Sequence, residues 1–312
     1  MKLIVTGYHD EAHYYEIESN QAQLLDRTPI LNASFIVKGN NVYYTYEQSD
    51  PLKLRSYQIN HNRFEVSDTL TLPLKRLTHL AYSPKYQLLF GASYHDGAYC
   101  VIKTHEGRFK GPATIYYDHP ERGLSRCHCV AVNHQETEFA LVNIAQDTLT
   151  RFHLPTMEVL STIHLPHGCG PRHMIYNQSG SYCYLITEYS NEIFAIRLTD
   201  DKIMPPISTL QHQGSVSYGA TLFFDEKETY LYGSNRGEET IVRFQLENHT
   251  LTNPFYFSTY GQHSRHMILS KDGKILITAN KNTNEVTLID IDTHQRIITI
   301  PFTQPSCMIE VD

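Results

Sequence analysis

The sequence lacks several features that would place it in a familiar class. It has no tryptophan, no C-x-x-C pair and no apolar run near the ~18 residues of a membrane-spanning helix. It has no G-x-S-x-G, Walker or G-x-G-x-x-G motif, which argues against an α/β-hydrolase, a P-loop protein and a Rossmann domain. Basic residues are outnumbered, with 26 Lys and Arg against 33 Asp and Glu, and the net charge of −7 argues against general nucleic-acid binding.

The N-terminal segment suggests a protein that stays in a reducing compartment. Met1–Val5 enters an apolar strand at once, without the charged and then apolar segments of a signal peptide. We therefore expect a cytoplasmic location and no membrane partner. In that compartment the cysteines are expected to be free thiols. The six are Cys100, Cys127, Cys129, Cys169, Cys183 and Cys307.

What the sequence does contain is one pattern repeated seven times. Each copy has an apolar strand with a distinctive residue pair near its start, and a polar tip follows about 15 residues later. The pairs are Ser34-Phe35, Thr78-His79, Cys127-His128, Arg172-His173, Gly219-Ala220, Arg265-His266 and Ser306-Cys307. A spacing of about 40–50 residues with several strands per unit is typical of a β-propeller.

The sequence therefore predicts an all-β fold, a seven-bladed β-propeller with four antiparallel strands in each blade, in a single domain of residues 1–312. In the fourth repeat, strands are expected at 172–177, 182–187 and 192–198, with a weaker outer strand near 204–211. The strand at 305–311 should pair with the strand at 3–7 in one blade. That pairing closes the ring and removes open sheet edges.

Polar residues of the repeat are expected to meet at one mouth of the central channel. Four strand starts carry His, and Arg precedes two of these, which predicts a cationic pocket holding one or two carboxylates. Buried Arg is rare unless it is paired, and its fork suits a carboxylate or phosphate. The candidates are His79, His128, Arg172, His173, Arg265 and His266 from the strand starts, and Glu47, Glu188, Asn235, Arg236 and Lys281 from the tips.

Other interpretations of the same residues stay open at this point. A His at a strand start can simply hydrogen-bond a neighbouring blade, and Glu188 can be no more than a salt-bridge partner. The oxygen donors of Glu47, Asn143, Glu188 and Asn235 could instead bind a hard cation such as Ca²⁺.

Zinc at Cys127-His128-Cys129 is disfavoured. In a regular strand the two cysteines point to one face and the histidine to the other, so the three cannot bind one ion together. No metal and no cofactor are predicted.

Three segments resemble the seven-bladed lactonase family, which includes propeller-type 6-phosphogluconolactonases and carboxymuconate cycloisomerases. They are Gly170–His173 followed by Thr187–Ile193, Ser234–Gly237, and Ser264–His266. The resemblance covers nearly the whole chain. The sequence departs from the family at the pocket, where Cys127-His128 replaces His-Pro-His, Tyr218–Ala220 lacks an acidic residue, and Ser264–His266 replaces Pro-Arg-Phe.

The resemblance implies hydrolysis of a small anionic lactone, most specifically 6-phosphogluconolactone. The family's proposed active-site residues correspond here to His128, Arg172, Glu188 and Arg236. Glu188 or His128 would activate water, Arg172 with His173 would stabilise the oxyanion, and Arg236 would hold a carboxylate or phosphate. A lactonising cycloisomerase and a non-catalytic propeller that binds a small anion or a partner are the alternatives.

Overall fold

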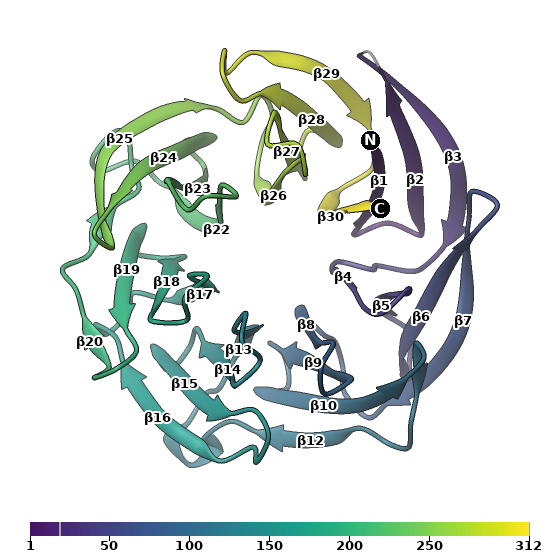
Figure 1. Ribbon diagram of the computed structural model, residues 1–312, viewed down its shortest axis with the longest axis horizontal. Helices are drawn as coiled ribbons and strands as arrows, with labels where there is room; N and C mark the ends of the chain where they lie inside the picture. The colour runs from purple at the N-terminus through teal and green to yellow at the C-terminus, as the bar shows by residue number, and fades with distance from the viewer. Residues whose placement is uncertain (19, 312) are drawn as a thin grey trace.

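The computed structural model describes residues 1–18 and 20–311. Seven antiparallel sheets stand around a central channel, each running from an innermost strand at the channel to outer strands at the rim (Figure 1). This arrangement confirms the predicted seven-bladed propeller. The described residues include one short 3₁₀ helix, η1 (Pro120–Arg122). They include no helix long and apolar enough to cross a membrane.

The first four blades follow the repeat in chain order. Blade one contains β4 (Ile36–Lys38), β5 (Tyr43–Glu47), β6 (Leu52–Asn60) and β7 (Arg63–Leu72). Blade two contains β8 (His79–Ser83), β9 (Leu88–Ser93), β10 (Ala98–His105), β11 (Arg108–Phe109) and β12 (Thr114–Tyr117). Blade three contains β13 (Cys127–Val132), β14 (Glu138–Asn143), β15 (Thr148–His153) and β16 (Val159–His164). Blade four contains β17 (Pro171–Tyr176), β18 (Tyr182–Thr187), β19 (Glu192–Arg197), β20 (Lys202–Ile203) and β21 (Ile207–Ser208).

The remaining blades complete the ring. Blade five contains β22 (Tyr218–Phe224), β23 (Tyr230–Arg236), β24 (Thr240–Glu247) and β25 (Thr250–Ser258). Blade six contains β26 (Ser264–Leu269), β27 (Ile275–Asn280), β28 (Glu285–Asp290) and β29 (Arg296–Pro301). Blade seven joins the C-terminal β30 (Pro305–Val311) to β1 (Lys2–Gly7), β2 (Glu11–Glu18) and β3 (Gln21–Pro29), so the predicted closure by the two chain ends is confirmed.

The core lies between neighbouring blades, because each strand turns alternate apolar residues toward the next sheet. Between blades three and four, for example, Val142 and Leu149 pack with Met174, Leu185 and Phe194. Tyrosine and phenylalanine supply the bulk that tryptophan would otherwise give, and several of these rings are fully buried. All six cysteines are free and buried, as expected.

Most inner strands carry an extra residue close to the mouth. In blade three, Cys127 pairs with Asn143 and Cys129 with Val142, which leaves His128 as an additional residue on the inner strand. Such a β-bulge bends the strand and redirects its side chains. Equivalent register shifts occur in blades four to seven, and in blades four, six and seven the extra residue is Arg172, Arg265 or Ser306.

The bulge corrects our expectation for the two cysteines of blade three. Cys127 packs with Phe90 of blade two, whereas Cys129 packs with Met174 of blade four. The two thiols therefore lie on opposite faces of the sheet, because the extra residue breaks the period-two alternation that we assumed.

Candidate functional site

Two rings of side chains follow from the bulges. The mouth ring contains the bulged residues with their counterparts in other blades, and its members that line the channel cavity are Ser34, Thr78, His128, Arg172, Arg265 and Ser306. The channel ring contains the next residue of each blade and consists of Phe35, His79, Cys129, His173, Thr221, His266 and Cys307. The sequence repeat had aligned His128 with His173 and His266. The register places it level with Arg172 and Arg265 instead.

Three of the four predicted catalytic residues are in direct contact. Glu188, at the end of β18, has its Oε2 atom 2.9 Å from Arg172 Nε and 2.9 Å from Arg236 Nη2. Both arginines are almost completely buried, with exposures of 5% and 3%. One carboxylate is thus shared by two guanidinium groups, and this cluster keeps one net positive charge.

Backbone carbonyl groups of blade five complete the coordination of both arginines. Arg172 donates to the carbonyl of Ala220, and Arg236 Nη2 donates to that of Gly219 at 2.9 Å. Gly219 lets blade five pack closely against blade four, because a Cβ atom there would collide with the carbonyl oxygen of Thr187. Blade five therefore supplies dipoles rather than the acidic residue common in the family.

The charged groups of this cluster shift one another's pKa values. Burial, followed by repulsion from Arg236 and Arg265, lowers the pKa of Arg172 to about 9. Burial would raise the pKa of Glu188, but Arg172 and Arg236 together hold this pKa below its usual value. At neutral pH the carboxyl group is ionised and both arginines are charged.

The mouth of the channel opens into a pocket of about 230 Å³. This is slightly below the range of about 300–1,000 Å³ typical of sites for drug-sized ligands, and it suits a small polar molecule. The lining residues are Tyr8, Ser34, Arg76, Leu77, Thr78, Tyr94, His95, His128, Glu188 and Arg265. Behind it lies a channel cavity of about 30 Å³, enough for a water molecule.

His128 stands where these two spaces meet and lines both. It is 8% exposed, and its Nδ1 atom has no hydrogen-bond partner among the described residues. Burial, with the positive charges of Arg172 and Arg265, lowers its pKa well below 6.5. The imidazole is therefore neutral near pH 7 and able to accept a proton.

Side chains of the channel ring form contacts between neighbouring blades. His173 Nδ1 accepts a hydrogen bond from Leu222 N–H at 3.2 Å, and His266 Nδ1 accepts one from Met308 N–H at 3.4 Å. Cys307 Sγ lies 3.8 Å from the carbonyl oxygen of Ile36 in the next blade. For His173 and His266 these contacts match the structural alternative, in which a strand-start histidine bonds the neighbouring blade.

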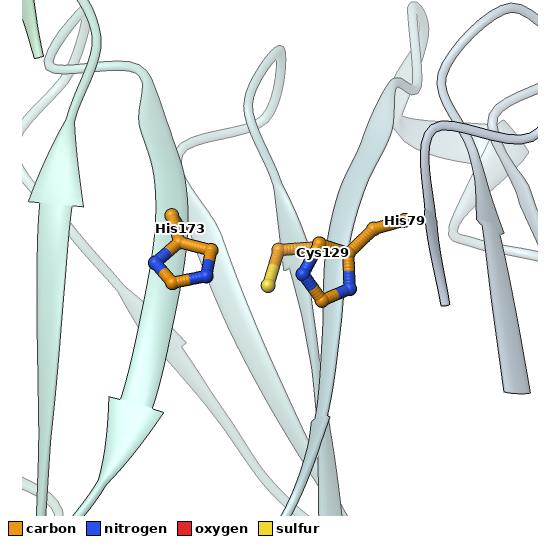
Figure 2. A group of neighbouring side chains, drawn as sticks. All are labelled: His79, Cys129 and His173. Carbon is orange, nitrogen blue, oxygen red and sulfur yellow. The ribbon is translucent and has the colours of Figure 1, made fainter. Parts of the chain in front are cut away.

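Three members of the channel ring lie together in space. Ligand atoms of His79, Cys129 and His173 all fall within 4.8 Å of one another, and Figure 2 shows the Cys129 sulfur between the two imidazoles. The donor set would suit zinc or copper. However, an Nδ1 that accepts from Leu222 leaves the proton of neutral His173 on Nε2, and burial raises the pKa of Cys129 to about 12. We therefore assign these side chains to packing.

Two predicted substrate-binding residues lie elsewhere. Asn235 is fully buried, donates to the carbonyl of Thr209 at 2.6 Å and accepts from its hydroxyl at 2.7 Å, so its side chain joins strands and lines neither space. Glu47 forms an ion pair with Arg55 on the adjacent strand. We do not retain either residue in the site, and the proposed Ca²⁺ site loses these two oxygen donors.

Sequence analysis missed Tyr8. It follows β1 and pairs with Gln304, as Glu188 follows β18 and pairs with Gly170. Tyr8 is therefore the tip residue of blade seven, and extending the repeat through the N-terminal strand would have identified it. Its ring lies among cations: the centroid is 5.0 Å from Arg76 Cζ, 5.4 Å from Arg265 Cζ and 5.2 Å from Lys281 Nζ.

Comparisons with known proteins agree with the fold. The family model described as "Lactonase, 7-bladed beta-propeller" matches residues 3–305. A 6-phosphogluconolactonase of Formosa agariphila is 23% identical over 92% of this chain and 90% of its own length. A 6-phosphogluconolactonase of Bacillus subtilis is 22% identical over 84% of this chain and 80% of its own.

Solved structures share the fold. The periplasmic gluconolactonase of Pseudomonas aeruginosa has a TM-score of 0.87 at 16% identity and covers 99% of this chain and 98% of its own. A protein from Lactobacillus plantarum has a TM-score of 0.86 at 19% identity, covering 99% of each chain. At these identities the structures support the fold alone.

Proposed function

Because the chain belongs to the seven-bladed β-propeller lactonase family, we propose that it hydrolyses a small anionic sugar lactone in its mouth pocket. The substrate class that we propose is a phosphorylated sugar lactone such as 6-phosphogluconolactone. Its curated relatives of that name support this choice.

The charge of the pocket carries the proposal. Glu188 is the one acidic side chain among the described residues that line the pocket, and two arginines already share it. Arg76 and Arg265 line the same space, with Lys281 beside them around Tyr8. Uncompensated positive charge in a partly desolvated pocket favours an anionic ligand.

The proposed mechanism uses His128 as the base and Arg172 as the oxyanion donor. The neutral imidazole of His128, which lines the pocket, accepts a proton from water, and that water adds to the lactone carbonyl carbon. The charged guanidinium of Arg172 stabilises the negative charge that develops on the carbonyl oxygen. Glu188 holds Arg172 and Arg236 in place, because its Oε2 atom is already shared by both guanidinium groups.

Arg236 is not retained as the residue that binds the substrate anion. This guanidinium is 3% exposed and is occupied by Glu188 and blade-five carbonyls. Arg76 and Arg265, which line the pocket, are the proposed phosphate contacts. We expect Arg76→Gln to raise KM for 6-phosphogluconolactone and to leave KM for unphosphorylated gluconolactone unchanged.

The decisive test is hydrolysis of both lactones by purified protein, measured above the spontaneous rate. Arg172→Ala and Glu188→Gln should each lower kcat/KM by about 10²–10³-fold, as expected for loss of a preorganised electrostatic group. Arg197→Ala is the control, because Arg197 pairs with Asp200 on the exposed outer part of the same blade. Wild-type rates in both pocket variants would refute the assignment.

The same assay separates the alternatives. Turnover of a muconate diacid but of neither lactone would favour the lactonising reaction, and anion binding without turnover would favour a non-catalytic propeller. We also propose a cytoplasmic location. Cell fractionation tests it directly, since one similar structure is of a periplasmic protein.

A further inference from the structure

Lactone hydrolysis requires a proton donor as well as a base. When the ring C–O bond breaks, the leaving alkoxide must take up a proton. The ring oxygen is bonded to the carbonyl carbon that the water attacks, so the proton donor should lie close to His128 and line the same two spaces, the mouth pocket and the channel cavity. The described residues that line both spaces are Tyr8, Ser34, Thr78, His128 and Arg265.

Chemistry narrows this set to one residue. Arg265 does not release its proton in a protein, and the hydroxyls of Ser34 and Thr78 are very weak acids. His128 is neutral and is already assigned to water. The phenol of Tyr8 remains, and it is the one side chain of the five with an acidic O–H.

The surroundings of Tyr8 suit a group that becomes negative during the reaction. Arg76, Arg265 and Lys281 come from two different blades and stand within 5.0–5.4 Å of its ring centroid. The Ser34 hydroxyl forms one hydrogen bond with Tyr8 and a second, short one with Tyr46. Preorganised cations around a developing phenolate stabilise it without reorganisation.

We propose that Tyr8 is the general acid, which donates its phenolic proton to the leaving ring oxygen of the lactone. Water oxygen bonds to the carbonyl carbon, and His128 takes one water proton. The ring C–O bond then breaks, its electron pair stays on the ring oxygen, and that oxygen receives the proton of Tyr8. The hydroxy acid departs, His128 loses its extra proton to solvent, and Tyr8 regains one. This inference rests on the proposed lactone hydrolysis.

The electrostatic setting of Tyr8 supports this role. Burial raises the pKa of Tyr8, but the charges of Arg265, Arg76 and Arg172 and the bond from Ser34 outweigh burial and hold the pKa below 10.0. The charged and titratable groups that face Tyr8 from the packed blades are Tyr46, Arg76, Arg172, Arg236, Arg265 and Lys281. All except Tyr46 are cationic, so each favours the phenolate.

Tyr8→Phe tests the proposal, since it removes the O–H and keeps the ring among its cations. We expect kcat for the sugar lactone to fall about 10²-fold with KM little changed, because the proton is transferred only in the transition state. Tyr230→Phe is the matched control: Arg243 lies 4.6 Å from that ring, far from both cavities along blade five. A kcat for Tyr8→Phe equal to that of the control would overturn the proposal.

A spectroscopic titration gives a readout apart from activity. Ultraviolet difference absorbance should show one tyrosine of the wild type ionising at lower pH than the others, and Tyr8→Phe should lack that step. Arg76→Gln should shift the step to higher pH, which keeps the test available if Tyr8→Phe does not fold. Titrations that superimpose for wild type and variants would contradict the inference. A wild type with the early step but without lactone turnover would refute the proposed function instead.

Discussion

Two buried arginine clusters in this propeller have opposite charge balances. The outer cluster joins blades three and four. Arg151 contacts Glu138 through Nε at 2.9 Å and Nη2 at 2.7 Å, forms an ion pair with Asp201 and donates to the carbonyl of Leu198. Tyr176 donates a further bond to Glu138. Two carboxylates surround one guanidinium, and these acids raise the pKa of Arg151 despite its burial.

The inner cluster at the pocket has the opposite charge balance, with more cations than anions. Two guanidinium groups share the single carboxylate of Glu188, with Arg265 close enough to repel both. Burial and that repulsion lower the pKa of Arg172 to about 9. A cluster that only held blades together would gain from a second acid here. Our proposal that the pocket binds an anionic ligand rests on this uncompensated positive charge.

The largest effect is expected on stability, at the outer cluster. Arg151→Met removes the cation and leaves Glu138 buried next to Asp201, so the free energy of unfolding should fall by about 3–5 kcal/mol. Urea denaturation of the purified variant measures this change. A loss smaller than that of an ordinary surface substitution would mean that the outer cluster is not a structural ion pair.

Arg172→Met should have the opposite pattern, with little change in stability and a large loss of activity. Glu188 keeps Arg236 as its partner, and the pocket loses a mutually repelling cation, so the free energy of unfolding should stay within about 1 kcal/mol of wild type. Lactone hydrolysis should fall by about 10²–10³-fold, because the oxyanion loses its donor. If Arg172→Met unfolds as readily as Arg151→Met, the two clusters do not differ in the way that we describe.

His173→Phe tests the channel ring. Phe35 already occupies the equivalent position of blade one, so the ring position accepts the aromatic side chain. The backbone N–H of Leu222 loses its acceptor, which should cost about 1–3 kcal/mol in the free energy of unfolding. kcat should change little. A large loss of activity in a stable variant would restore His173 to the catalytic machinery, as first predicted.

The sequence was sufficient to predict the architecture and to group three candidate site residues that lie in contact. The repeat defined seven blades and the closure of the ring, because its period depends only on which residues are apolar and where turns occur. Arg172, Glu188 and Arg236 were predicted together, and they are in contact. A buried arginine needs a partner, and the tip of blade four offered the nearest carboxylate.

The finer register could not be predicted from spacing. A β-bulge adds one residue without changing the apolar pattern on either side, so spacing aligns His128 with the wrong ring and places Cys127 and Cys129 on one face instead of two. Asn235 is polar and stands at a tip of the repeat, but its amide is used in hydrogen bonds to Thr209, in the segment that links blades four and five. Tyr8 was missed because the tip of blade seven lies at the other end of the chain.

The smallest expected effect is on the acid stability of the inner cluster. Because its arginines hold the pKa of Glu188 below the ordinary value of 4.5, the carboxylate contributes stability above about pH 4.5. That contribution is lost as the pH falls through the folded-state pKa. The difference in unfolding free energy between wild type and Glu188→Gln should therefore be constant near neutral pH and shrink below pH 4.5.

Inorganic phosphate should narrow the same difference at neutral pH, because an anion in the pocket replaces part of the charge that Glu188 supplies. If the difference in unfolding free energy between wild type and Glu188→Gln changes with neither pH nor phosphate, the inner cluster, like the outer one, is complete without a ligand.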